Sequence, residues 1–378
     1  MLTRTIWWLT CATSLSAAAA IHAESAEAGW SPKSAAAYLD ERANWWATWP
    51  EAARDQNTFC ISCHTALPYA LSRAALGSKL GQAVPAKAEV TLISNVTKRV
   101  RLWNRIAPYY EGNSHGSDNS TRSRGTEAVL NALILANHDA ENVEPGDDTR
   151  TAFDNMWRLQ RTSGDVSGSW SWLQFDNEPW EAHDSEYYGA ALAAVAVGTV
   201  PSNYRFNPNI QANLQLLRGY LSRQYANQSI INHVVLLWAS ERWPGLLNPE
   251  QQAIIVSEVV KKQRQDGGWN LGSLIWSWRD WSLTSLAKMW RSDDTPLDSK
   301  ADAYATGLVT FVLEQAGLPP GDAHVKQGRG WLARNQDKAT GAWPSYSVNG
   351  RRDPSSGMGR FMSDAGTAYA VLALTVAR

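Results

Sequence analysis

The stretch Asp364-Ala-Gly-Thr-Ala-Tyr-Ala-Val-Leu372 joins one polar residue to a run of small and apolar residues. Asp is a favourable helix N-cap, and a helix that is apolar nearly all round is normally buried. Five other segments share this register, with the polar residue at His64, Ser123, Asp184, Asn227 and Asp302. The sequence therefore predicts six buried helices, each beginning near one of these polar residues.

More amphipathic stretches separate the buried helices. They cover residues 32–47, 86–106, 148–160, 208–224, 249–264 and 322–335. An open array of such helix pairs needs polar caps on its terminal repeats, yet the last buried segment stays rich in Ala, Val and Leu. Closing the pairs into a ring removes that need. We therefore expect an all-α fold, an (α/α)6 toroid of six alternating inner and outer helix pairs. It would form one domain over residues 24–378, with an insertion at 270–298.

Glutamine and tryptophan residues follow three of the predicted outer helices. The clearest copy is Gln263-Arg-Gln-Asp-Gly-Gly-Trp269, and looser copies run from Gln336 to Trp343 and from Gln160 to Trp170. These segments resemble the QW motifs of the squalene/hopene cyclase and prenyltransferase (terpenoid cyclase) superfamily, whose fold is an (α/α)6 toroid. The resemblance implies a structural role for these side chains at the helix ends. It covers the fold but not the chemistry, because the sequence lacks the Asp-x-Asp-Asp motif of such cyclases.

The first 23 residues have the features of a Sec-type signal peptide. Arg4 supplies a positive start, residues 6–20 form a short apolar core, and Ala23 precedes a polar stretch. This apolar core is too short to span a membrane. We expect a periplasmic or secreted protein without a transmembrane anchor in the mature chain. The 35 Lys and Arg residues against 36 Asp and Glu give no surplus of positive charge, so we expect no nucleic-acid partner.

Two of the three cysteines lie in the motif Cys60-Ile-Ser-Cys63-His64, and the third lies in the predicted signal peptide. The C-x-x-C-H spacing is typical of c-type cytochromes, in which two thiols attach one haem c covalently and the histidine is the proximal iron ligand. Export would place the motif where paired cysteines are normally used. A Cys60–Cys63 disulfide, a zinc site and a redox dithiol are the alternatives.

The C-x-x-C-H motif has the register of an inner-helix start, so we expect the haem at one mouth of the ring. Ring closure would bring the loop 357–362 beside it, and Met358 or Met362 would then be placed to supply the second axial ligand. His115 and His183 are further candidates, and an open sixth position is another alternative. Without a haem, the methionines would be packing residues and the histidines exposed loop residues.

A polar cluster precedes the third inner helix. We expect Glu181, His183 and Asp184 to be the acid or base groups if the ring has a catalytic role. Helix capping is the simpler explanation for Asp184, Asp302 and Asp364. The insertion at 270–298 is rich in tryptophan, which is typical of a lid, a partner surface or packing against the ring.

Two hypotheses about function follow. The first is a c-type haem protein with a redox role, either electron transfer to a periplasmic redox partner or oxidation of an organic ligand in the central cavity. As an enzyme it would be a haem-dependent oxidoreductase. The second is a haem-free squalene-cyclase-like protein that binds or isomerises an apolar, isoprenoid-like ligand, with Cys60–Cys63 as a disulfide. A secreted interaction scaffold is a third alternative.

Overall fold

The computed structural model describes residues 29–110, 116–175, 177–275, 300–350 and 352–375. The predicted signal peptide, the candidate ligand His115 and most of the predicted insertion lie outside these ranges. Over the described residues, no helix combines the length and the apolar character that crossing a membrane requires.

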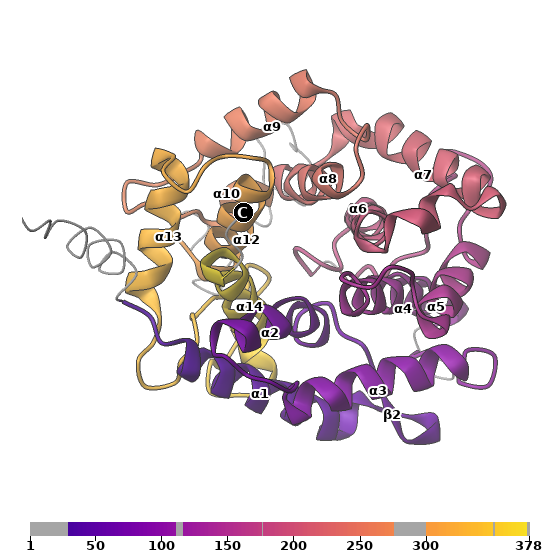
Figure 1. Ribbon diagram of the computed structural model, residues 1–378, viewed down its shortest axis with the longest axis horizontal. Helices are drawn as coiled ribbons and strands as arrows, with labels where there is room; N and C mark the ends of the chain where they lie inside the picture. The colour runs from indigo at the N-terminus through magenta and orange to yellow at the C-terminus, as the bar shows by residue number, and fades with distance from the viewer. Residues whose placement is uncertain (1–28, 111–115, 176, 276–299, 351, 376–378) are drawn as a thin grey trace, which may run out of the picture.

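Six helices form the inner layer of a ring (Figure 1). They are α2 (Ala66–Lys79), α4 (Gly116–His138), α6 (Ser185–Thr199), α8 (Ile230–Arg242), α12 (Ala303–Gln315) and α14 (Phe361–Thr375). Each packs against the next, and α14 packs against α2, which closes the ring. Their small residues allow close approach, and α6 is buried along almost its whole length. The prediction of an all-α helical toroid is confirmed.

Six further helices cover the outside of the ring. They are α1 (Pro32–Thr48), α3 (Lys87–Arg101), α5 (Asp147–Arg158), α7 (Gln211–Gln224), α9 (Pro249–Val260) and α13 (Ala323–Asn335). Most ends agree with the sequence prediction to within a few residues. The start of α9 shows why: Asn248 and Gln251 form a capping box around Pro249. Within the described ranges, the remaining helical pieces are α10 (Leu271–Ile275), η2 (Pro50–Ala52), η3 (Asp55–Asn57), η4 (Ser202–Phe206), η5 (Pro208–Ile210), η6 (Tyr225–Asn227) and η7 (Met358–Arg360).

The starts of three inner helices differ from the prediction. Ser123 lies inside α4, which begins earlier, at Gly116. Asn227 lies in η6, and Ser229 is the N-cap of α8. Asp364 lies in the first turn of α14, and its carboxylate accepts hydrogen bonds from other side chains instead of capping the helix. Asp302 does cap α12, because its Oδ1 accepts from the Ala305 N–H.

The Gln and Trp residues that follow the outer helices bind backbone atoms. Gln263 Nε2 donates to the carbonyls of Gly267 (2.8 Å) and His324 (2.9 Å), and Trp269 Nε1 donates to the carbonyl of Val259 (2.8 Å). The amide thus ties its own loop to the next outer helix, while the indole ties the loop back to the outer helix before it. This is the structural role that the sequence predicted.

The copy at Gln336 joins the end of the ring to its beginning. Its Nε2 donates to the carbonyls of Gly341 (2.9 Å) and Ser31 (3.1 Å), and Ser31 is the N-cap of α1. Gly341 has φ of +80°, and a Cβ at this position would collide with the backbone of Ser34. Trp343 Nε1 donates to the Leu332 carbonyl at 2.7 Å. These contacts link the last outer helix to the first.

Candidate functional site

A short hairpin leads the chain into the C-x-x-C-H motif. Strand β1 (Ala53–Arg54) pairs with β2 (Thr58–Phe59) in antiparallel register. The side chain of Asn95 on α3 brackets the end of β2, since its Oδ1 accepts from the Phe59 N–H and its Nδ2 donates to the Phe59 carbonyl, both at 2.9 Å. The hairpin therefore delivers Cys60 at a fixed position against α3.

The serine within the motif starts the first inner helix. Ser62 Oγ accepts from the backbone N–H groups of Thr65 (3.2 Å) and Ala66 (3.0 Å), which would otherwise lack partners at the beginning of α2. Trp46 on α1 donates from Nε1 to the Cys60 carbonyl at 2.7 Å. The motif is thus held between α1, α2 and α3 at the end of the ring where the inner helices begin.

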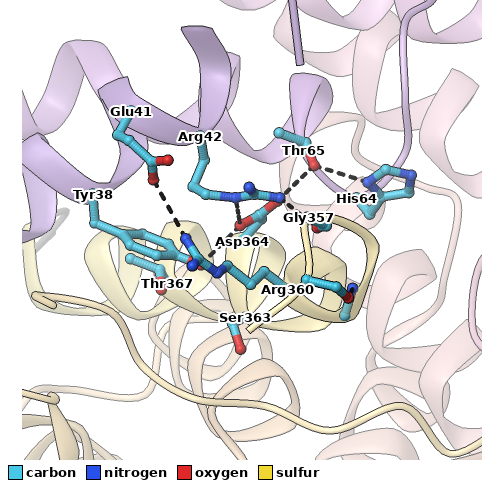
Figure 2. A network of polar contacts seen from close by, with 12 residues as sticks. Tyr38, Glu41, Arg42, His64, Thr65, Gly357, Arg360, Ser363, Asp364 and Thr367 are labelled. Carbon is cyan, nitrogen blue, oxygen red and sulfur yellow. Dashed lines mark hydrogen bonds and ion pairs between the residues drawn. The ribbon is translucent and has the colours of Figure 1, made fainter. Parts of the chain in front are cut away.

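A buried polar network lies directly behind the motif, and Figure 2 shows it joining α1, α2 and α14. Asp364 accepts from Arg42 Nε (2.7 Å), Arg42 Nη2 (3.0 Å), the Tyr38 hydroxyl (2.8 Å) and the Thr65 hydroxyl (2.8 Å). Burial raises the pKa of Asp364, and its donors, Arg42 foremost, oppose that rise. Because all four groups, from three residues, donate to it, the ionised carboxylate is the form that they stabilise.

The same network defines the hydrogen-bonding state of His64. Thr65 Oγ1 donates its one proton to Asp364 and lies 2.9 Å from His64 Nδ1 (Figure 2). The hydroxyl oxygen must therefore accept from Nδ1–H, which leaves a lone pair on Nε2. No described residue forms a hydrogen bond with Nε2. Metal-binding histidines have this arrangement, in which the second ring nitrogen donates to a fixed acceptor.

Aromatic rings enclose the imidazole. Phe361 stacks on His64 with a centroid distance of 3.7 Å, and Trp46 and Trp180 approach it at 5.0 Å and 5.8 Å. Burial lowers the pKa of His64 to about 3, because the charged imidazolium would lose its hydration among these rings. The histidine is therefore neutral, which is the form that ligates metals.

Two cavities meet at His64. One, of about 190 Å³, is lined by the motif residues Cys60, Cys63 and His64, together with aromatic side chains of Trp46, Trp49, Tyr109, Tyr110 and Phe361. The other, of about 130 Å³, is lined by His64, Phe361, Met358 and Met362, and by polar residues that include Glu178 and Arg352. Glu181 lines both cavities. The two thiols and the two methionines thus lie on cavities that share the histidine.

The structure brings some of the predicted site residues together and separates others. Met362 is buried (5% exposed), whereas Met358 is 48% exposed, and both line the cavity with His64. Burial raises the pKa of Glu181 at the same cavity. His183 is exposed and lines neither cavity. Asp184 Oδ2 accepts from Ser229 and Asn232, both at 3.0 Å, and so ties α6 to α8.

Several residues that shape this site were not predicted from the sequence. Arg99 on α3 forms a buried ion pair with Glu127 on α4 through Nε–Oε1 (2.6 Å) and Nη2–Oε2 (2.9 Å), and both line the cavity of the thiols. Phe361, which stacks on His64, was predicted only as part of a loop. A lone arginine in an amphipathic stretch does not indicate by itself that it faces inward.

The donor set fits a covalently attached haem. Cys60 and Cys63 are free thiols in the structure, and burial raises the pKa of Cys60 to about 12 and that of Cys63 well above its usual range. Both are therefore neutral thiols beside a neutral imidazole with an open Nε2. No described cluster of three or more His, Cys, Asp or Glu side chains is arranged to bind a bare metal ion.

Comparisons with known proteins add little to this geometry. No protein-family model matches the sequence, and no curated protein matches it. Among solved structures, a glycosidase superposes with a TM-score of 0.47 over 89% of this chain and 96% of its own, at 15% sequence identity. A likeness at this level carries no argument about activity. The protein is therefore an all-α toroid with a site at one mouth that is lined by two thiols and an imidazole.

Proposed function

We propose that this protein is an exported c-type haem protein with a redox role, built on an (α/α)6 toroid. Cys60 and Cys63 would hold one haem c covalently, and His64 would bind its iron. The observation that carries the proposal is that His64 shares a cavity with both thiols, while its Nδ1 is bonded to Thr65 and its Nε2 has no hydrogen-bond partner among the described residues.

The chain's own residues have defined tasks in this proposal. Thr65 and Asp364 hold the proton on Nδ1 of His64, which keeps the ring from rotating and leaves Nε2 facing away from the network. Phe361 packs on the imidazole face at 3.7 Å and excludes water from it. When bound, haem c supplies one-electron chemistry, whose potential depends on the axial ligands and their surroundings.

Electron transfer is the redox role that we propose, because it makes the smaller demand on the protein. It requires only a haem edge that a redox partner can approach, whereas oxidation of an organic molecule also requires an open iron position and a pocket for the substrate. The partner would be a periplasmic redox protein.

Met362 is the residue that we propose as the second axial ligand. It is buried on the cavity shared with His64, whereas Met358 is about half exposed. Replacement of a methionine axial ligand lowers the reduction potential of a c-type haem. Met362→Ala should therefore lower the midpoint potential in a spectroelectrochemical titration, and Met358→Ala should leave it unchanged. Equal potentials in the wild type and both variants would contradict this assignment.

The pyridine haemochrome spectrum tests the haem itself. The full chain is exported from cells that carry the cytochrome c maturation machinery and is washed with acidified organic solvent before measurement. We expect the spectrum of a haem with two thioether bonds in the wild type and none in Cys60→Ala/Cys63→Ala. His138→Ala, which changes an exposed histidine at the far end of α4, should retain the signal. A colourless wild type would contradict the proposal.

A further inference from the structure

The hydroxyl of Thr65 links the imidazole of His64 to a buried carboxylate. Its oxygen lies 2.9 Å from His64 Nδ1, and its proton is donated to Asp364 Oδ2 at 2.8 Å (Figure 2). The side chains of Thr65 and Asp364 are both buried. The link therefore lies in a region of low dielectric constant, where a hydrogen bond is electrostatically stronger than in water.

The hydrogen bonds of this link can run in only one direction. The other three hydrogen bonds of the Asp364 carboxylate come from Arg42 and Tyr38, and all are donated to it. The ionised carboxylate has no proton to give, so the Thr65 hydroxyl donates to it and accepts from Nδ1–H of His64. Consecutive hydrogen bonds polarise one another. Arg42 balances the charge of Asp364 at a distance, but only Thr65 joins the carboxylate to the imidazole.

The position of Thr65 does not depend on its hydroxyl. The Thr65 N–H donates to Ser62 Oγ at 3.2 Å, and the Thr65 carbonyl accepts from the Tyr69 N–H at 3.3 Å in the first turn of α2. Across the ring closure, α14 supplies both Phe361, which stacks on the imidazole, and Asp364 in the same first turn. A substitution that removes only the hydroxyl should therefore leave the surroundings of His64 in place.

We propose that Thr65 is a positioning residue that lowers the reduction potential of the haem by connecting His64 to Asp364. This inference rests on the proposed function, because it takes His64 as the iron ligand. A fixed acceptor for Nδ1–H makes the imidazole a more basic ligand. A more basic ligand favours ferric over ferrous iron, and hydrogen bonds to the axial ligand are one of the means by which proteins tune a haem.

Spectroelectrochemical titration of the full-length haem protein tests this role. Thr65→Val keeps the branched shape of the side chain and removes the hydroxyl, whereas Thr65→Ser keeps the hydroxyl. Loss of the partner of a metal-binding histidine changes metal affinity by about 10–100-fold, and a tenfold change in a one-electron couple corresponds to about 59 mV. We expect the midpoint potential of Thr65→Val to rise by about this amount and that of Thr65→Ser to stay at the wild-type value.

Thr149→Val is the matched control. Thr149 on α5 is also buried, and its Oγ1 also donates to a carboxylate oxygen, Asp139 Oδ2, at 2.6 Å. Asp139 directly follows the end of α4, at the side of the ring away from the C-x-x-C-H motif. This substitution removes the same kind of hydrogen bond without affecting His64, so the midpoint potential should not change.

The protonation of the His64 ring gives a second measurement that needs no haem. In full-length Cys60→Ala/Cys63→Ala with 15N-labelled histidine, NMR shows which ring nitrogen carries the proton, and His64→Gln in this background identifies the signals. We expect the proton on Nδ1 when residue 65 is threonine or serine. Thr65→Val should abolish this preference, because Nδ1–H then lacks its acceptor.

The outcomes separate the role of Thr65 from the haem proposal. A wild type without haem would overturn both. A haem-containing wild type whose potential equals or exceeds that of Thr65→Val would overturn only the role of Thr65, as would an equal rise in Thr65→Ser or Thr149→Val. A proton on Nε2 of His64 in the haem-free protein would also overturn this role, and that measurement requires no substitution of Thr65.

Discussion

The buried ion pair between Arg42 and Asp364 joins the first outer helix to the last inner helix, and Asp364→Asn should damage the fold severely. Both side chains are 2% exposed, and the carboxylate accepts from Nε and Nη2 of the arginine. The amide of asparagine has one acceptor oxygen and an NH2 group that faces donors. Arg42 would therefore keep its buried charge without a counter-charge, and we expect a loss of about 3–5 kcal/mol in the free energy of unfolding.

The assay is urea unfolding of the full-length protein followed by circular dichroism. Asp148→Asn is the matched control, because Arg101 binds Asp148 with the same fork geometry, Nε–Oδ1 at 2.6 Å and Nη2–Oδ2 at 2.8 Å. That pair is on the surface, with 66% of the arginine exposed, and such pairs contribute little. We expect almost no change for the control.

A double variant separates the lost charge pair from a general intolerance of the position. Arg42→Met/Asp364→Leu removes both charges, so it should recover a large part of the stability that Asp364→Asn loses. Unfolding of Asp364→Asn at the same urea concentration as Asp148→Asn would contradict a stabilising role for the buried ion pair. A double variant that is less stable than Asp364→Asn would also contradict it.

Three other predictions concern the ring. Burial raises the pKa of Asp302 to about 6 from 3.8, so the folded protein binds this proton more tightly than the unfolded chain does. The stabilisation from the protonated side chain is complete below pH 3.8 and is lost as the pH rises through 6. Asp302→Asn should therefore remove up to about 3 kcal/mol of the change in unfolding free energy that urea unfolding measures between pH 4 and 7. Gln336→Ala removes the side-chain bonds to Ser31 and should lower the free energy of unfolding by about 1–3 kcal/mol in the same assay. Gly341→Ala should lower the melting temperature more than Gly81→Ala, since both glycines have positive φ but only Gly341 lies against another backbone segment.

The ring was predictable because the features that define each helix lie within a short stretch of sequence. Inner helices need small and apolar residues on every side, and Asp184-Ser-Glu-Tyr-Tyr-Gly-Ala-Ala-Leu192 has them. Outer helices carry caps such as Asn248 and Ser31, which define their ends to within a few residues. The starts of helices that lack a strong cap were predicted less accurately. The helix α4, for example, begins seven residues before Ser123, where the sequence predicted its start.

The site was predictable where it depends on short spacing or on ring closure. The C-x-x-C-H motif is contiguous, and closure of the ring brings Met362 to the cavity of His64, as expected. The partner of Asp364 was not predictable, because nothing in the sequence around Arg42 shows that this arginine of an amphipathic helix faces inward. A cavity of about 450 Å³ where the inner helices end was also not predicted, because it depends on how the ends of six helices pack together.

Peptide mapping would show whether Cys60 and Cys63 carry a covalently bound haem. Trypsin cleaves after Arg54 and Arg73, so the fragment 55–73 contains the whole C-x-x-C-H motif. We expect this fragment to absorb as haem, to have the mass of the peptide plus one haem, and to have no thiol that reacts with an alkylating agent. A colourless fragment 55–73 with two alkylated cysteines, or with a Cys60–Cys63 disulfide, would contradict covalent haem attachment.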